Sequence, residues 1–197
     1  DAISVRETFA KDYLMKVLDK KIDVISDPTF LLSREEWIDK LASKSKYYKC
    51  EEKYILTYFV SKEKNSRECI QFIKNYSQKY NYPVWSIQFS TYYSKTGDKK
   101  ILGASMEDFL ALVLNAQIII TDSFHGTALS LNLEKNFVSY NNSENPLRVH
   151  NLLNRLHLLE RINMDYESYK TIDYKNVRKG IDEIRKESQE WIVDAIE

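Results

Sequence analysis

The 197-residue chain carries 29 basic and 29 acidic side chains, so its formal net charge is zero. This balance excludes the positive surface that nucleic-acid binding requires, and the 43% apolar content is sufficient for one domain or one domain plus part of another. No apolar run approaches the ~20 residues of a membrane-spanning helix, and Cys50 and Cys69 lack the spacing of a metal site or disulfide framework. We interpret both as reduced thiols of a cytoplasmic protein.

The first 45 residues predict one β–α–β unit. Ala2–Val5 is a short apolar strand, Thr8 can cap a helix that runs to about Leu18, and Ile22–Ile25 is a second strand. Asp27, before Pro28, is typical of a turn. One such unit cannot cover both faces of a sheet, so we expect residues 1–45 to end a Rossmann-like domain whose earlier part lies outside this chain. The helix is expected to bury its apolar face, which consists of Phe9, Tyr13, Leu14, Val17 and Leu18.

Strands alternate with helices over residues 46–174, which is typical of an open, parallel, doubly wound α/β sheet. The strands are expected at Tyr54–Val60, Val84–Phe89, Ile118–Thr121 and Phe137–Tyr140, with a polar loop after Phe89. The helices are expected from Asn65 or Ser66 to Tyr80, over Phe109–Ala116 behind a capping box at Ser105–Asp108, from the 122–127 loop to about Leu133, over Asn145–Leu159 and over Tyr174–Ile196.

The stretch Ile118–Thr127 carries the strongest functional signal. An apolar strand ends in the polar loop Asp122–Thr127, and a helical pattern restarts at Ala128. Ligands of open α/β sheets bind at the carboxyl ends of strands, and a helix N-terminus attracts anions. We therefore expect an anion near the N–H groups of Gly126 and Thr127, with His125 as a titratable donor. In the alternative interpretation, Ser123 or Thr127 only caps the helix and Gly126 relieves a turn, which leaves His125 unexplained.

Several segments together resemble the polysaccharide pyruvyl transferase family. The most specific is Thr121–Ala128, with its Asp-Ser-Phe-His-Gly string, preceded by Met106–Phe109 and Ala116–Ile119. The similarity spans nearly the whole chain in order. Weaker agreement comes from Ile3–Glu7, which is similar to a family strand ending in Arg-Asp or Arg-Glu, from Asp27–Leu32 with Trp37 downstream, and from Arg148–Leu153 continuing to Leu158 and Arg161.

This resemblance implies a GT-B-type arrangement, in which two Rossmann-like domains face each other across a cleft. Residues 46–174 would form the second domain, and the helix over 175–197 would cross back toward the first. The resemblance also implies transfer of the enolpyruvyl group of phosphoenolpyruvate onto a sugar hydroxyl of a surface polysaccharide. The partners would then be this donor and a glycan or lipid-linked sugar, which would bring the protein near a membrane, with no cofactor besides the donor substrate.

The site residues that the resemblance implies fall into two groups. His125 would act as the general acid or as a phosphate-binding imidazolium, and Asp122 as a base or as a group that orients His125, although Asp122 could simply stabilise the helix N-terminus. Arg6, at its strand end, would face the same cleft, with a salt bridge to Glu7 or Asp12 as the alternative. No metal-ligand spacing is visible, so we expect a metal-independent transfer. The substrate-binding group comprises Arg6, Ser123, Phe124, Gly126, Thr127 and Arg148.

One residue departs from the family pattern. Many members carry an arginine two positions before the histidine, where this chain has Ser123. Arg148 or another basic residue would then replace that cation, or the donor differs. Two further hypotheses therefore stay open: a GT-B-type glycosyltransferase that uses a nucleotide-sugar donor, and a non-catalytic family member.

Overall fold

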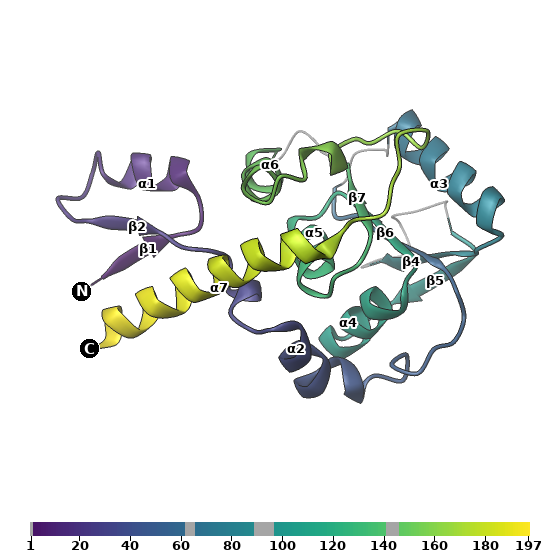
Figure 1. Ribbon diagram of the computed structural model, residues 1–197, viewed down its shortest axis with the longest axis horizontal. Coiled ribbons are helices and arrows are strands. Elements are labelled where there is room, and N and C mark those ends of the chain that lie inside the picture. The colour runs from purple at the N-terminus through teal and green to yellow at the C-terminus, as the bar shows by residue number, and fades with distance from the viewer. Residues whose placement is uncertain (1, 62–65, 89–96, 141–145) are drawn as a thin grey trace.

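The computed structural model describes residues 2–61, 66–88, 97–140 and 146–197. Figure 1 shows a main body built on a five-stranded sheet, a small β–α–β unit at one end, and the long helix α7 (Tyr174–Ile196) running from the body toward that unit. Within the described ranges, no helix is both long and apolar enough to cross a membrane.

The main sheet is parallel throughout, with strand order β5-β4-β3-β6-β7. The chain builds one side of β3 and then returns to build the other, so the order reverses between β3 and β6. This is the Rossmann-like, doubly wound topology that the alternating pattern predicts, and the reversal marks the usual ligand position at the carboxyl ends of the strands. The strands are β3 (Ile55–Tyr58), β4 (Val84–Gln88), β5 (Lys99–Leu102), β6 (Ile118–Thr121) and β7 (Phe137–Ser139).

Helices cover both faces of this sheet, which explains why its central strands are apolar on both sides. Successive residues of β6 alternate between the two cores: Ile118 and Ile120 pack with α3 (Arg67–Tyr80), whereas Ile119 packs on the opposite side. That opposite face is covered by α4 (Met106–Asn115), α5 (Phe124–Asn132), α6 (Pro146–Arg155) and part of α7. The predicted elements are confirmed within a few residues, although Asn65, Phe89 and Asn145 lie outside the described residues.

β5 is a strand where the sequence predicts a polar loop. It lies at the edge of the sheet beside β4, and three of its four residues are exposed. Edge strands often carry lysines, which discourage pairing with other chains. Because Lys99 and Lys100 interrupt the apolar pattern, a search for apolar runs does not identify this strand. Between the two units the chain forms η1 (Pro28–Phe30), α2 (Arg34–Lys40) and η2 (Ala42–Lys44), and η3 (Leu159–Arg161) follows α6.

The N-terminal unit consists of β1 (Ile3–Val5), α1 (Thr8–Leu14) and β2 (Ile22–Val24), and its two strands are parallel. Three details differ from the prediction. α1 ends at Leu14 rather than Leu18, Glu7 occupies the N-cap position instead of Thr8, and the helix does not bury its apolar face. Two short strands offer too little area to cover a helix, so Phe9, Tyr13 and Val17 are 53%, 66% and 62% exposed.

Candidate active site

The predicted site lies at the reversal point of the sheet, where β6 enters α5. Ser123 is the N-cap residue of α5, and its Oγ accepts the N–H of Gly126 at 3.3 Å. The N–H of Thr127 donates to the carbonyl oxygen of Ser123 at 3.0 Å. Ser123, Gly126 and Thr127 are buried. The helix therefore uses the N–H groups of Gly126 and Thr127 for its own cap, and an anion at these groups stays a prediction.

Gly126 is required by close packing rather than by a turn. A Cβ at this position would overlap Thr121 Oγ1 and lie 3.1 Å from Thr121 Cβ and Cγ2. Thr121 cannot move away easily, because its hydroxyl donates to the carbonyl oxygen of Tyr58 at 2.6 Å and accepts the N–H of Ser123 at 3.0 Å. The glycine thus lets α5 start close to the ends of β3 and β6.

The carboxylate of Asp122 connects the ends of two neighbouring strands. It accepts the N–H of Val60 at 2.7 Å and the N–H of Ser61 at 3.1 Å, both of which follow β3. These bonds hold the carboxyl ends of β3 and β6 together beneath the site. This structural role between two strands is not among the three roles suggested by the sequence, and a catalytic role of Asp122 stays a prediction.

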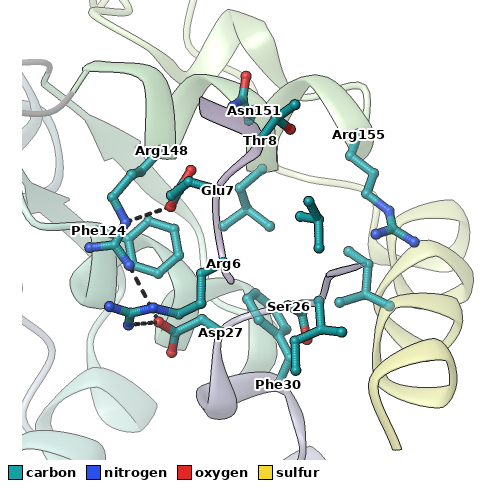
Figure 2. A pocket seen from close by; sticks show the side chains of 14 residues that line it. Arg6, Glu7, Thr8, Ser26, Asp27, Phe30, Phe124, Arg148, Asn151 and Arg155 are labelled. Atoms are coloured by element: carbon teal, nitrogen blue, oxygen red, sulfur yellow. Dashed lines mark hydrogen bonds and ion pairs between the residues drawn. The ribbon is translucent and has the colours of Figure 1, made fainter. Parts of the chain in front are cut away.

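Two guanidinium groups converge on one carboxylate oxygen (Figure 2), and the imidazole of His125 lies near the same oxygen. Oδ2 of Asp27 lies 2.5 Å from Arg6 Nη1, 3.4 Å from Arg148 Nη2 and 3.8 Å from His125 Nε2. Arg6 follows β1, Asp27 follows β2, His125 belongs to α5 and Arg148 to α6. The structure therefore brings together Arg6, His125 and Arg148, as the resemblance implies, through a residue that the sequence analysis treats as a turn former.

Asp27 is buried and firmly held. Its side chain is 2% exposed, and Oδ1 accepts the N–H of Thr29 at 3.1 Å and the hydroxyl of Thr29 at 3.0 Å. Burial tends to raise the pKa of Asp27, but the hydrogen bonds from Thr29 and Arg6 and the charge of His125 outweigh burial and hold that pKa below its ordinary value. Asp27 is therefore an anion in the folded protein at neutral pH.

Glu7 and Phe124 fix the orientation of Arg148. The Nε of Arg148 donates to Glu7 Oε1 at 2.7 Å, and its guanidinium carbon lies 4.1 Å from the centre of the Phe124 ring (Figure 2). A guanidinium that stacks on an aromatic ring keeps its plane fixed while its edge stays available for hydrogen bonds. Phe124 thus positions a cation, and its ring also packs edge-on to His125 at 5.5 Å.

These groups line a cavity of about 250 Å³ between the N-terminal unit and the main body. Arg6, Asp27, Phe124 and Arg148 form one wall, and His125 adjoins it through Asp27 and Phe124. Ser123, Gly126 and Thr127 lie behind this wall in the cap of α5, not among the lining residues. The sequence analysis missed Glu7 and Asp27 as site residues; their positions within three residues of the ends of β1 and β2 were the available signal. Additional polar residues that line the cavity are Thr8, Ser26, Asn151 and Arg155, of which Arg155 lies across the cavity from Arg148 (Figure 2).

A cluster of three or more side chains able to hold a metal ion is not found within the described part of the chain. The charged groups of the cavity are instead arranged as ion pairs, with guanidinium groups from both units. Such an arrangement suits a small ligand that carries more than one negative charge.

The fold and this cavity define a Rossmann-like α/β protein with a cationic pocket at the reversal point of its sheet. The sequence model of one family, polysaccharide pyruvyl transferase, matches residues 1–144, and the chain belongs to that family. The match includes Arg6, Asp27 and His125, whereas Arg148 follows it. No curated protein matches the chain. The predicted family is therefore confirmed, and membership indicates polysaccharide pyruvyl transferase activity in general terms.

Proposed function

We propose that this chain carries the donor site of an enzyme that transfers the enolpyruvyl group of phosphoenolpyruvate onto a sugar hydroxyl. The acceptor is a polysaccharide unit or a lipid-linked sugar, and the protein is cytoplasmic and meets a membrane only through such an acceptor. The observation that carries the proposal is the convergence of Arg6, His125 and Arg148 on Asp27 at the border of one cavity. The proposal includes no cofactor beyond the donor.

The charge of phosphoenolpyruvate suits the two guanidinium groups. Its carboxylate and phosphate both accept paired hydrogen bonds, which arginine provides in a planar fork. Arg6 is 47% exposed and contacts Asp27 through Nη1, so most of its five N–H donors remain for a ligand. Arg148 replaces the cation that many family members carry at the position of Ser123.

The proposed reaction needs one proton donor. His125 gives a proton to the methylene carbon of the donor, the sugar oxygen forms a bond to the adjacent carbon, and the hydroxyl proton passes to a base. The carbon–oxygen bond to phosphate then breaks with both electrons going to phosphate. A second sugar hydroxyl forms a bond to the same carbon to complete the ketal, and its proton passes to the released phosphate. His125 is 52% exposed at the cavity border, where it can recover a proton from solvent.

The domain organisation follows from the same proposal. Residues 1–45 end a first Rossmann-like domain, residues 46–174 form the second, and the helix over 175–197 returns to the first. The ion pairs of Arg6 and Arg148 with Asp27 then connect the two domains across the donor site.

Titration calorimetry on the full-length protein distinguishes this function from its alternatives. We expect phosphoenolpyruvate to bind, and UDP and GDP to bind at least tenfold more weakly. Release of phosphate in the presence of a sugar acceptor, with a pyruvate ketal detected by mass spectrometry, would establish the reaction. Preferred binding of a nucleotide would instead support a glycosyltransferase, and binding of none of these ligands would support a non-catalytic member.

A further inference from the structure

Asp27 lies beside basic side chains from three parts of the chain: Arg6 after β1, His125 in α5 and Arg148 in α6. Arg6, Arg148 and His125 approach the same oxygen, Oδ2, at 2.5, 3.4 and 3.8 Å. We infer that Asp27 is a positioning residue for the proposed reaction, which places a negative charge beside His125 and aligns the two guanidinium groups around the donor. This inference rests on the proposed function.

The carboxylate is the fixed part of this cluster. Asp27 precedes Pro28, whose ring fixes one backbone angle, and both Thr29 bonds go to Oδ1. Oδ2 is therefore left to face the cations, in a side chain that is 2% exposed. Arg6 and His125 are each about half exposed and so have more freedom to adjust to a ligand. The hydrogen-bonded carboxylate of Asp27 is therefore the fixed group that orients the more exposed side chains of Arg6 and His125.

The charges around His125 show why this anion matters. Asp27 faces His125 from the segment after β2, Arg6 from the end of β1 and Arg148 from α6, while Glu7 pairs with the Nε side of Arg148. Nearby positive charges oppose protonation of an imidazole, and a nearby negative charge favours it. Without Asp27, only Glu7 would offset the two guanidinium groups near His125, which disfavours the protonated ring.

The test follows the ring signals of His125 by NMR as a function of pH in the full-length protein. The His125→Gln variant assigns the signal by its loss, which separates it from those of His150 and His157. In Asp27→Asn we expect the titration midpoint to fall by about 0.5–1 pH unit, at the lower end of what a close charge produces because the ring is half exposed. Glu7→Gln is the matched control: it also replaces a carboxylate beside Arg148, and should move the midpoint less.

Kinetics provide a second readout on the same variants. In Asp27→Asn we expect kcat to fall by roughly 10–100-fold, a larger change than in KM for phosphoenolpyruvate, because loss of a proton donor acts on the chemical step. The alkaline limb of the pH–rate profile should move to lower pH by the same amount as the NMR titration. A purely structural role of Asp27 would lower the rate without moving this limb.

The variant Arg6→Gln provides an independent test in case Asp27→Asn does not fold. Arg6→Gln removes a competing cation from Oδ2, so the midpoint of His125 should move to higher pH. An unchanged midpoint in Asp27→Asn, or a downward move in Arg6→Gln, would overturn the inference. If the midpoints move as expected in a protein that transfers no pyruvyl group, the inferred pairing stands and the proposed function fails instead.

Discussion

His125 occupies the first turn of α5 and carries its imidazole at the edge of the cavity. Its ring lies edge-on to Phe124, and Nε2 points to the oxygen of Asp27 on which the two arginines converge. Since a general acid must reach both a proton source and the ligand, a half-exposed ring beside a cationic pocket meets both requirements. The same position would also suit a histidine that only holds phosphate, and substitution separates the two roles.

We expect His125→Ala to lower the rate of pyruvyl transfer by roughly 10²–10⁴-fold, the usual contribution of a general acid. His125→Gln keeps hydrogen bonding but cannot deliver a proton, so it should be nearly as inactive. If His125 only bound phosphate, His125→Gln would keep much of the rate and lose donor affinity instead. Initial rates of phosphate release in the full-length protein measure the effect. His150→Ala, on the exposed side of α6, should retain full activity.

Gly126 gives the second prediction at this scale. Gly126→Ala should lower the free energy of unfolding by about 1–3 kcal/mol, because its new methyl group would collide with the hydrogen-bonded Thr121. Gly180→Ala in the interior of α7 is the control: its Cβ would meet only the flexible end of Leu156 at 2.8 Å, and the gain in helix propensity of about 1 kcal/mol offsets that contact. Urea denaturation monitored by circular dichroism measures both. Equal stability of the two variants would contradict the packing argument.

At the scale of elements, α7 is fastened to the segment that leaves the N-terminal unit. Arg185 donates to the carbonyl oxygen of Phe30, Gln189 to that of Leu31, and Trp191 to the carboxylate of Asp23. Ser188 is buried and accepts the N–H of Ser26 at 3.1 Å while sharing a hydrogen bond with the Ser26 hydroxyl. This segment includes Asp27, so the contacts of α7 help to hold Asp27 in its place at the candidate site.

Ser188→Ala tests this fastening. The substitution leaves the half-buried N–H of Ser26 without its acceptor, which costs about 1 kcal/mol, the lower end of the range for a buried group. We expect faster hydrogen exchange at the amide of Ser26 together with that loss of stability. Ser43→Ala, which removes an exposed hydroxyl bonded to the carbonyl oxygen of Asp39, should change stability by less than about 0.5 kcal/mol. Unchanged exchange at Ser26 would show that α7 does not hold the segment.

The sequence predicts elements well where burial determines their composition. Ile118–Thr121 is a central strand because both of its faces are covered, and an apolar run is the direct result. The prediction fails where burial is small. β5 is an edge strand with exposed lysines, and α1 has an amphipathic pattern whose apolar side remains exposed beside a two-stranded sheet. The periodicity of a sequence indicates which face of a helix is apolar, but it does not indicate whether other described residues pack against that face.

At the scale of the whole molecule, the candidate site exists only because distant segments meet. Arg148 and Asp27 are separated by 121 residues, and Arg6 and Asp27 by 21. Strand ends can be located in a sequence, and so could Arg6 and His125. The convergence of side chains on Asp27 could not be predicted. The local sequence indicates only a turn before Pro28 and contains no information about which basic side chains the fold places next to Asp27. At Gly126 and Thr127 the structure shows the cap that the sequence analysis gives as the alternative, because Ser123 accepts both N–H groups.

This long-range cluster should make the stability of the molecule depend on pH. The pKa of Asp27 lies below its ordinary value of 3.8 because hydrogen bonds from Thr29 and Arg6 outweigh burial. A carboxyl group whose pKa is lower in the folded than in the unfolded state contributes stability above the unfolded pKa, and that contribution is lost as the pH falls through the folded value. The stability lost on replacing Asp27 by Asn should therefore be full at pH 7 and shrink below about pH 4.

Urea denaturation of the wild-type protein and Asp27→Asn at pH 7, 5, 4 and 3 measures this difference. We expect Asp27→Asn to lower the free energy of unfolding by about 1.5–3 kcal/mol at pH 7, the range for hydrogen bonds to a charged group. We do not expect more, because Arg6 is half exposed and solvent partly screens its ion pair with Asp27. Asp194→Asn, on the exposed end of α7, controls for the general loss of a negative charge. A difference that stays constant down to pH 3 would mean that Asp27 stabilises the fold through packing alone. A difference that shrinks in acid would identify its charge as the link between the N-terminal unit, α5 and α6.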